Sequence, residues 1–210
     1  INIIEKIIGY RLTIKQIFQK TTVEALCSLF NNAEKLKNER ITKSADKERY
    51  PMSSAQKRMY FMDQVDEDHM AYHMTKCLKV QGKLDIDKLH NSFTEMLNRH
   101  AIFRTEFIVQ GKEFYQVIKE KSVVDFKVIE NDNKTDNELI NEFVKPFDIS
   151  KLPLIRMQVV VRKNDYLVLI DQHHIIGDMI SSRIFIEEFA CLYNDNLLRL
   201  ALLFLISGCD

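Results

Sequence analysis

Residues 166 to 179 read YLVLIDQHHIIGDM, an apolar run that ends at two adjacent histidines. A branched, apolar run that gives way to polar residues is typical of a buried central strand that enters a loop. Gly177 and Asp178 then precede an amphipathic segment, which predicts a helix over residues 181–193. We therefore expect the functional site at the end of this strand.

The two histidines have different expected environments. Successive residues of a strand point to opposite faces, so His173 and His174 cannot enter the same cavity if the strand persists to its end. One is available for chemistry and the other for structure. Asp178 follows a glycine at a helix start, a position that also suits an ordinary N-cap.

The composition excludes two classes of partner. The chain has 210 residues, of which 46% are hydrophobic, enough for a sizeable core. Its 30 basic residues balance 30 acidic ones, which removes the attraction that nucleic acid or an anionic membrane surface supplies. We expect no nucleic-acid partner and no membrane partner.

Cysteine spacing and hydropathy support the same class of protein. The cysteines have no paired spacing, which argues against a disulfide framework and favours a cytoplasmic location; they are Cys27, Cys77, Cys191 and Cys209. The longest apolar run, residues 197–206, contains Arg199 and has about half the length of a membrane span.

The chain changes character twice along its length. Residues 1–31 carry apolar residues at helical spacing, and Thr21 with Glu24 forms a capping-box pattern, which predicts short helices of a helical domain that has lost its start. Residues 32–49 are charged and polar, as in a solvated linker. Residues 50–195 alternate between strand and helix patterns.

The alternation predicts an α/β (α+β) fold with a mixed sheet flanked by helices. We expect helices over residues 53–65, 85–99, 136–144 and 181–193. We expect strands over residues 73–80, 123–129, 154–161 and 166–172, and a hairpin of residues 105–109 and 114–118 across Gly111.

Three motifs in this region resemble those of the condensation domain of nonribosomal peptide synthetases. They are PMSSAQKRMY at residues 51–60, RHAIFRTEF at residues 99–107 and HHIIGD at residues 173–178, which is similar to the family's HHxxxDG. Residues 146–149 and 153–156 also follow the family pattern. The order and spacing of the motifs over residues 50–195 make the resemblance specific.

The resemblance implies a chloramphenicol-acetyltransferase-like lobe, the first of the two lobes in such a domain. Residues 1–31 resemble the last helices of a peptidyl carrier domain, which leaves a short helical remnant before the lobe. Residues 196–210 fit the family poorly and are expected to be a divergent or truncated tail.

The function that the resemblance implies is amide formation. The donor is an upstream acyl or peptidyl thioester, and the acceptor is the amine of a downstream aminoacyl thioester. Both are presented as phosphopantetheine thioesters on carrier domains, so no cofactor or metal is expected to bind the lobe directly. The implied partners are the two carrier domains, an adenylation domain and the second lobe of the same polypeptide, without which the fragment is expected to be inactive.

The motif positions imply a role for each polar residue. His174 takes the catalytic or substrate-orienting role, since histidine changes protonation near neutral pH. His173 is structural and shapes the site. Asp178 pairs with Arg104, and that pair shapes the site; the alternatives are an N-cap for Asp178 and a solvated surface position for Arg104.

One residue departs from the family pattern. Met179 stands where the family has glycine, and we expect it to tilt the helix start or crowd the substrate channel, which puts activity in doubt. His69 and His73 are four residues apart and could share a helix face, but no third ligand accompanies them, so a metal site is not expected.

Three functions stay open at this point. The first is an amide-forming condensation domain, and the second is a related acyltransferase or epimerisation domain, which also carries an HHxxxD-type histidine. The third is an inactive module that only docks carriers. A heterocyclisation domain is disfavoured, because that variant has an aspartate motif in place of the histidines.

Overall fold

The computed structural model describes residues 14–30, 45–131 and 133–194. It divides into two units, residues 1–46 and residues 47–210. The expected helix near the N-terminus and the expected tail over residues 196–210 lie outside the described residues.

The first unit contributes two described helices, α2 (Ile14–Gln19) and α3 (Val23–Phe30). The hydroxyl of Thr22 accepts a hydrogen bond from the Ala25 amide at 3.2 Å, so Thr22 caps α3. The expected cap at Thr21 is therefore wrong by one residue, because the helix begins at Val23.

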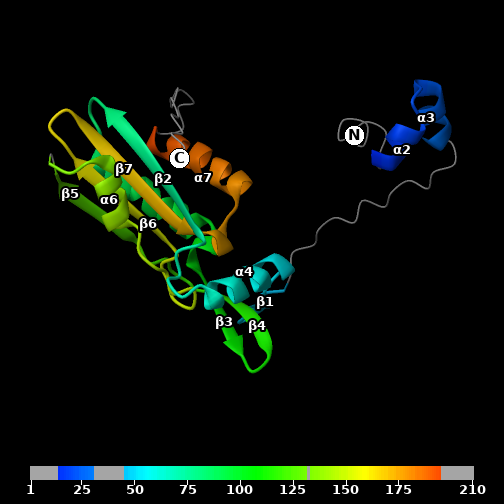
Figure 1. The fold of residues 1–210 in the computed structure, drawn as a ribbon, viewed down its shortest axis with the longest axis horizontal. Helices are drawn as coiled ribbons and strands as arrows, with labels where there is room; N and C mark the ends of the chain where they lie inside the picture. Colours follow the sequence, from blue (N-terminus) through cyan, green and yellow to red (C-terminus); the bar gives the residue numbers. More distant parts are fainter. Residues whose placement is uncertain (1–13, 31–44, 132, 195–210) are drawn as a thin grey trace. The chain divides into compact units, whose positions relative to one another are not determined.

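The second unit has the expected alternation of strands and helices (Figure 1). Its helices are α4 (Ser54–Val65), α5 (Ile86–Arg99), α6 (Asp136–Phe143) and α7 (Met179–Tyr193), with short 3-10 turns η1 (Ala101–Arg104) and η2 (His174–Ile176). Its strands are β1 (Tyr50–Pro51), β2 (His73–Gln81), β3 (Thr105–Gln110), β4 (Glu113–Ile118), β5 (Asp125–Glu130), β6 (Ile155–Val161) and β7 (Asp165–His173).

The strands form two sheets. The larger sheet has the order β2-β7-β6-β5, with β5 and β6 parallel and the other pairs antiparallel. The smaller sheet has the order β1-β4-β3 and is antiparallel. β7 is thus a central strand, as the apolar run at residues 166–172 predicts, and it pairs with β2 so that His73 lies opposite His173.

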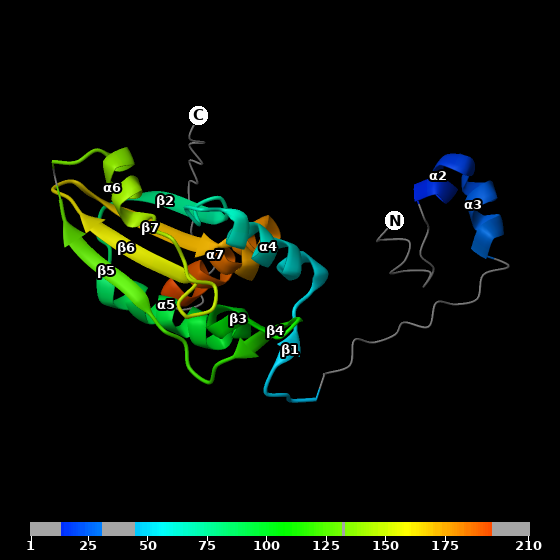
Figure 2. The same cartoon turned by 60° about the horizontal axis from the view of Figure 1, so that its bottom comes forward.

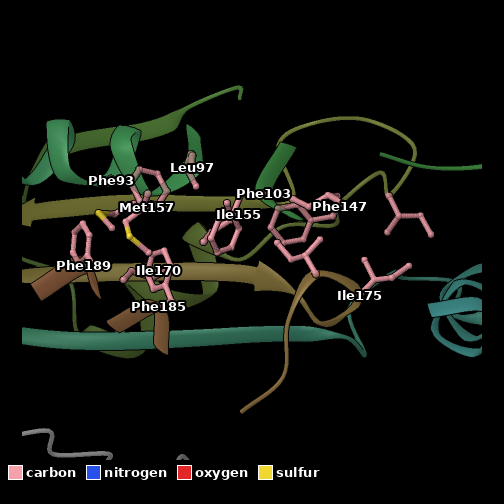
Figure 3. Packing of buried hydrophobic residues seen from close by; sticks show 14 of the residues in the cluster. Phe93, Leu97, Phe103, Phe147, Ile155, Met157, Ile170, Ile175, Phe185 and Phe189 are labelled. Atoms are coloured by element: carbon pink, nitrogen blue, oxygen red, sulfur yellow. The ribbon is translucent and has the colours of Figure 1, made fainter. Parts of the chain in front are cut away.

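Helices cover both faces of the larger sheet (Figure 2). On one face, α5 and α7 pack against alternate residues of β6 and β7 to form the main core (Figure 3). On the other face, α6 places Leu139 and Phe143 against Leu167 and Leu169. The mixed sheet with flanking helices confirms the expected fold class.

Several predicted elements are confirmed with their local causes. Ser53 caps α4 through a capping box with Gln56, and Asp85 caps α5. Gly111 has φ +64 in the β3–β4 hairpin, a left-handed conformation that glycine adopts without a steric penalty. The face expected to be apolar on α5 is buried, with Leu89, Phe93, Met96 and Leu97 in the core.

Candidate active site

The end of β7 places the two histidines in different environments. His173, the last residue of the strand, is fully buried. His174 opens the η2 turn and is half-buried. Its backbone amide donates a hydrogen bond to the Tyr72 carbonyl at 2.8 Å, so the turn is attached to the chain that leads into β2.

No hydrogen bond to the His174 ring is found among the described residues. Its Nδ1 atom is shielded from solvent and makes no hydrogen bond within the described part of the chain. A histidine nitrogen is a good donor or acceptor, and buried polar atoms usually have a partner. The Nδ1 atom of His174 is thus an exception among the buried polar atoms of the site.

His173 is held by hydrogen bonds on both ring nitrogens. Its Nε2 lies 3.3 Å from Oδ1 of Asp63, which is buried at the end of α4, and its Nδ1 accepts a hydrogen bond from the Ile175 amide at 3.0 Å. Burial lowers the pKa of His173, and the Asp63 carboxylate opposes this shift. The His173 ring is therefore buried and contacts a polar group at each of its two nitrogens.

A second buried polar cluster lies beside His173 on the same face of the sheet. Asp171 is fully buried and contacts three side chains: Nδ1 of His73 at 2.9 Å, the hydroxyl of Thr75 at 3.0 Å and Nε of Arg156 at 3.3 Å. The Arg156 Nε is not oriented for a hydrogen bond, so its attraction to Asp171 is mainly Coulombic. Burial lowers the pKa of Arg156, and Asp171 opposes this shift.

Phe147 fixes the geometry of that cluster. Its ring stacks on His73 with the ring centres 5.1 Å apart, and the Arg156 guanidinium lies 3.8 Å from the ring centre. This arrangement holds Arg156 beside Asp171 by a cation–π contact.

Gly177 permits a close approach behind the η2 turn. A Cβ atom at this position would lie 2.8 Å from Nε2 of Gln172 and 3.1 Å from the Ser181 hydroxyl. The Gln172 amide is buried and in turn lies 3.4 Å from the Ser182 hydroxyl. A side chain at position 177 would therefore displace the end of the buried Gln172 side chain, whereas the extended backbone of Gly177 suits any residue.

Asp178 caps α7. Its carboxylate accepts hydrogen bonds from the Ser181 amide and hydroxyl, both at 2.8 Å, and these bonds lower the pKa of Asp178. Asp178 is exposed, and the ordinary N-cap alternative describes it.

The expected ion pair between Asp178 and Arg104 is wrong. Nη1 of Arg104 donates to the Lys119 carbonyl, and no ion pair joins Arg104 to Asp178 in the part of the chain that the structure describes. The reason is that η1 leads Arg104 toward the end of β4, while Asp178 uses its carboxylate on its own helix. Arg104 is only half-buried, and its Nε has no hydrogen-bond partner among the described residues.

Met179 does not disturb the helix start. It is the first residue of α7, and its side chain is 84% exposed. The expected tilt and crowding are therefore not seen within this unit.

His69 and His73 do not share a helix. His69 lies in a loop with φ 52, and His73 opens β2 and contacts the His69 carbonyl at 3.1 Å. The described residues contain no group of three or more side chains suited to a metal ion. None of the described helices is long and apolar enough to span a membrane.

Two cavities flank this region. One, of about 470 Å³, lies between α4 and the segment before β6 and is lined by Tyr60, Asp63, His69, Phe147 and Asp148 among others. The other, of about 210 Å³, is mostly apolar and is lined by Phe103, Gln172, Ile176, Gly177, Ile184 and Phe185 among others. The second cavity adjoins the turn that follows His174.

The sequence did not predict Asp63 and Asp171 as part of the site. Asp171 carried a usable signal, because a single carboxylate within an apolar strand must find a buried partner. Asp63 carried no such signal: it lies in an unremarkable helical position, and only the packing of α4 against η2 brings it to His173.

A family model described as "Condensation domain" matches residues 46–200. Bacitracin synthase 2 of Bacillus licheniformis is 36% identical over 193 residues, which cover 91% of this chain and 7% of that protein. Surfactin synthase subunit 2 of Bacillus subtilis (strain 168) is 38% identical over 182 residues, which cover 86% of this chain and 5% of that protein. The chain thus spans less than a tenth of the length of these relatives.

Solved structures resemble the chain in fold. The starter condensation domain of rhizomide synthetase has a TM-score of 0.62 and 16% identity, covering 69% of this chain and 38% of that one. The X-domain from teicoplanin biosynthesis has a TM-score of 0.62 and 21% identity, covering 72% of this chain and 33% of that one. The condensation domain of monacolin K polyketide synthase has a TM-score of 0.63 and 21% identity, and the match covers 70% of this chain and 34% of that one.

Proposed function

Since the chain belongs to the condensation-domain family of nonribosomal peptide synthetases, we propose that it takes part in forming an amide bond between two carrier-bound substrates. The donor is an upstream acyl or peptidyl thioester, and the acceptor is the amine of a downstream aminoacyl thioester. Because the chain spans only a small part of its relatives, the activity is that of the full-length protein that contains it.

The chemistry needs few groups from the protein. A thioester carbonyl is already activated, so the acceptor amine attacks it directly, its extra proton is removed, and the carrier thiolate leaves. Orientation of two bound reactants supplies about 7–11 kcal/mol in favourable cases, and general acid–base help supplies about 10²–10⁴-fold in rate. Positioning of the amine is thus the larger task.

His174 is the residue that we propose for this task. The observation that carries the proposal is the contrast at the end of β7: the His173 ring is buried and bonded on both nitrogens, whereas the neighbouring His174 ring is half-buried and has no protein hydrogen bond among the described residues. In our proposal, His174 accepts a hydrogen bond from the attacking amine and orients it toward the donor carbonyl.

The test is peptide-bond formation by the full-length protein with loaded donor and acceptor carriers. We expect His174→Ala to lower the single-turnover rate by about 10²-fold or more. His90→Ala is the matched control, because His90 is exposed on α5 and its ring contacts Phe126 at a ring edge. Unchanged product with His174→Ala would refute the proposal.

The partners follow from the same proposal. They are the upstream and downstream carriers with phosphopantetheine arms, an adenylation domain and a second lobe of the same polypeptide. The chain covers 38% of the solved rhizomide domain, and we propose that the second lobe of the same polypeptide is required for activity. We also propose that residues 1–31 end a carrier domain, 32–49 form a linker, 50–195 form the first lobe, and 196–210 form a divergent tail.

The unpaired cysteine spacing supports a cytoplasmic location for this protein. Among the described residues, Cys27 and Cys191 form no disulfide.

A second candidate is a carrier-docking module without catalysis. One observation favours it: Asp178 and Arg104 do not pair among the described residues. The same assay separates the two functions, since a docking module keeps its product yield when His174 is replaced.

A further inference from the structure

Asp63 is brought to the end of β7 by a long-range packing contact. It lies in α4, 110 residues before His173 in the sequence, and its Oδ1 is 3.3 Å from the His173 Nε2. Asp63 is 2% exposed and His173 is 0% exposed, so this contact is shielded from water. Figures 1 and 2 both show α4 beside the end of β7.

The hydrogen bonds define which nitrogen of His173 carries the proton. The Ile175 amide donates to Nδ1 at 3.0 Å, and a nitrogen that accepts a hydrogen bond carries no proton. In the neutral ring the proton is then on Nε2, which faces the Asp63 carboxylate. Burial lowers the pKa of His173, and this favours the neutral ring.

We infer that Asp63 is a positioning residue: it holds His173 in the tautomer whose Nδ1 receives the Ile175 amide, and so fixes the η2 turn that carries His174. The inference rests on the proposed function of His174. The inference links two motifs of the sequence: α4, which contains most of the motif at residues 51–60, helps to set the geometry of the motif at residues 173–178.

The turn has other anchors, but they do not depend on a tautomer. The His174 amide donates to the Tyr72 carbonyl at 2.8 Å, and the Gly177 amide donates to the His174 carbonyl at 3.2 Å. The His173 side chain adds a further anchor, because its Nδ1 accepts the hydrogen bond from the Ile175 amide inside the turn. A flipped tautomer would place an Nδ1–H against that amide and leave two donors facing each other.

Two further side chains lie beside the Asp63 carboxylate. Its Oδ2 accepts a hydrogen bond from Nε2 of Gln64 at 3.3 Å, and Nδ1 of His69 lies 3.3 Å away without hydrogen-bond geometry. Asparagine at position 63 has a similar shape but only one acceptor oxygen. If its NH₂ group faces His173, the ring must accept on Nε2 and carry its proton on Nδ1.

The first experiment uses the 210-residue chain labelled with ¹⁵N in its histidine rings. Two-bond ¹H–¹⁵N correlation spectra distinguish protonated from unprotonated ring nitrogens, and loss of one set of signals in His173→Asn assigns the residue. We expect the wild-type ring to have a protonated Nε2 and an unprotonated Nδ1. A protonated Nδ1 in the wild type at neutral pH overturns the inference without any further variant.

Asp63→Asn should then populate the Nδ1–H tautomer. Asp68→Asn is the matched control, since Asp68 is exposed in the loop after α4, and it should leave the His173 signals unchanged. If Asp63→Asn does not fold, as judged by circular dichroism, Asp63→Glu replaces it, because the longer carboxylate keeps the charge but cannot keep the same distance.

The second experiment measures amide formation by the full-length protein. We expect Asp63→Asn to lower kcat by about 10²-fold with KM unchanged, the effect of a catalytic group displaced by about 1 Å. Asp68→Asn should have no effect. An unchanged kcat in Asp63→Asn, together with a changed tautomer, overturns the inference while the His174→Ala result still stands. An unchanged rate in His174→Ala overturns the proposed function instead.

Discussion

Replacement of Arg156 by methionine should destabilise the lobe strongly, because it removes the arginine that contacts the buried Asp171 carboxylate. The Arg156 side chain is 11% exposed and the Asp171 side chain 0%, with Nε and Oδ2 separated by 3.3 Å. At that distance and an effective dielectric constant of about 20, the attraction is about 5 kcal/mol. Removing one member of a buried pair costs about 3–5 kcal/mol.

The assay is urea unfolding followed by circular dichroism. For a slope near 2 kcal/mol per M, a loss of about 4 kcal/mol lowers the midpoint by about 2 M. Arg183→Met is the matched control: Arg183 pairs with Glu187 on the surface, its side chain is 80% exposed, and its loss should cost less than about 1 kcal/mol.

The double variant Arg156→Met with Asp171→Asn tests the cause. Because the stranded charge is removed, this variant should be more stable than Arg156→Met alone by about 1–3 kcal/mol. A urea midpoint for Arg156→Met within about 0.3 M of the wild-type midpoint would refute the reasoning. So would a double variant whose loss of stability equals the sum of the losses of Arg156→Met and Asp171→Asn.

Three further perturbations have defined outcomes. Gly177→Ala places a Cβ 2.8 Å from the Gln172 Nε2, so we expect a loss of about 1–3 kcal/mol and a Tm lower by about 2–12 °C, measured by thermal unfolding; an unchanged Tm contradicts the close approach. Ser53→Ala removes the capping box of α4 and should cost about 1 kcal/mol in urea unfolding, while Ser53→Thr should keep most of it. Burial lowers the pKa of His173 in the folded protein below its ordinary value of about 6.5. As the pH falls below about 6.5, His173 is therefore protonated in the unfolded chain before it is protonated in the folded protein. Protonation then favours unfolding, so the free energy of unfolding falls below about pH 6.5. His173→Asn should therefore weaken the pH dependence of the urea midpoint between about pH 7.5 and 5, and an identical dependence contradicts the assignment.

Periodic patterns predicted most of the elements of the lobe. α5 follows from one apolar face behind an Asp85 cap, and the β3–β4 hairpin follows from Gly111, because these signals act between residues close in the sequence. The start of α7 was predicted two residues too late: the helix begins at Met179, directly after its Asp178 cap.

Contacts between distant segments could not be predicted in the same way. The prediction of an Arg104–Asp178 ion pair was wrong, because opposite charges alone do not determine whether the fold brings two side chains together. Conversely, Asp63 and Asp171 gained importance only when α4 and β2 were packed beside β7. The position of His174 after a buried strand was predictable, but the absence of hydrogen bonds to its ring among the described residues required coordinates.

The short strand β1 sets a limit on where this lobe can be spliced into another protein. Tyr50 and Pro51 pair with Gln116 and Tyr115 of β4, and the Met52 amide continues the ladder by donating to the Phe114 carbonyl at 3.0 Å. A recombination junction placed after these residues would strip one strand from the small sheet. Chimeric synthetases should therefore be joined upstream of Tyr50, so that the transplanted module keeps its own first strand.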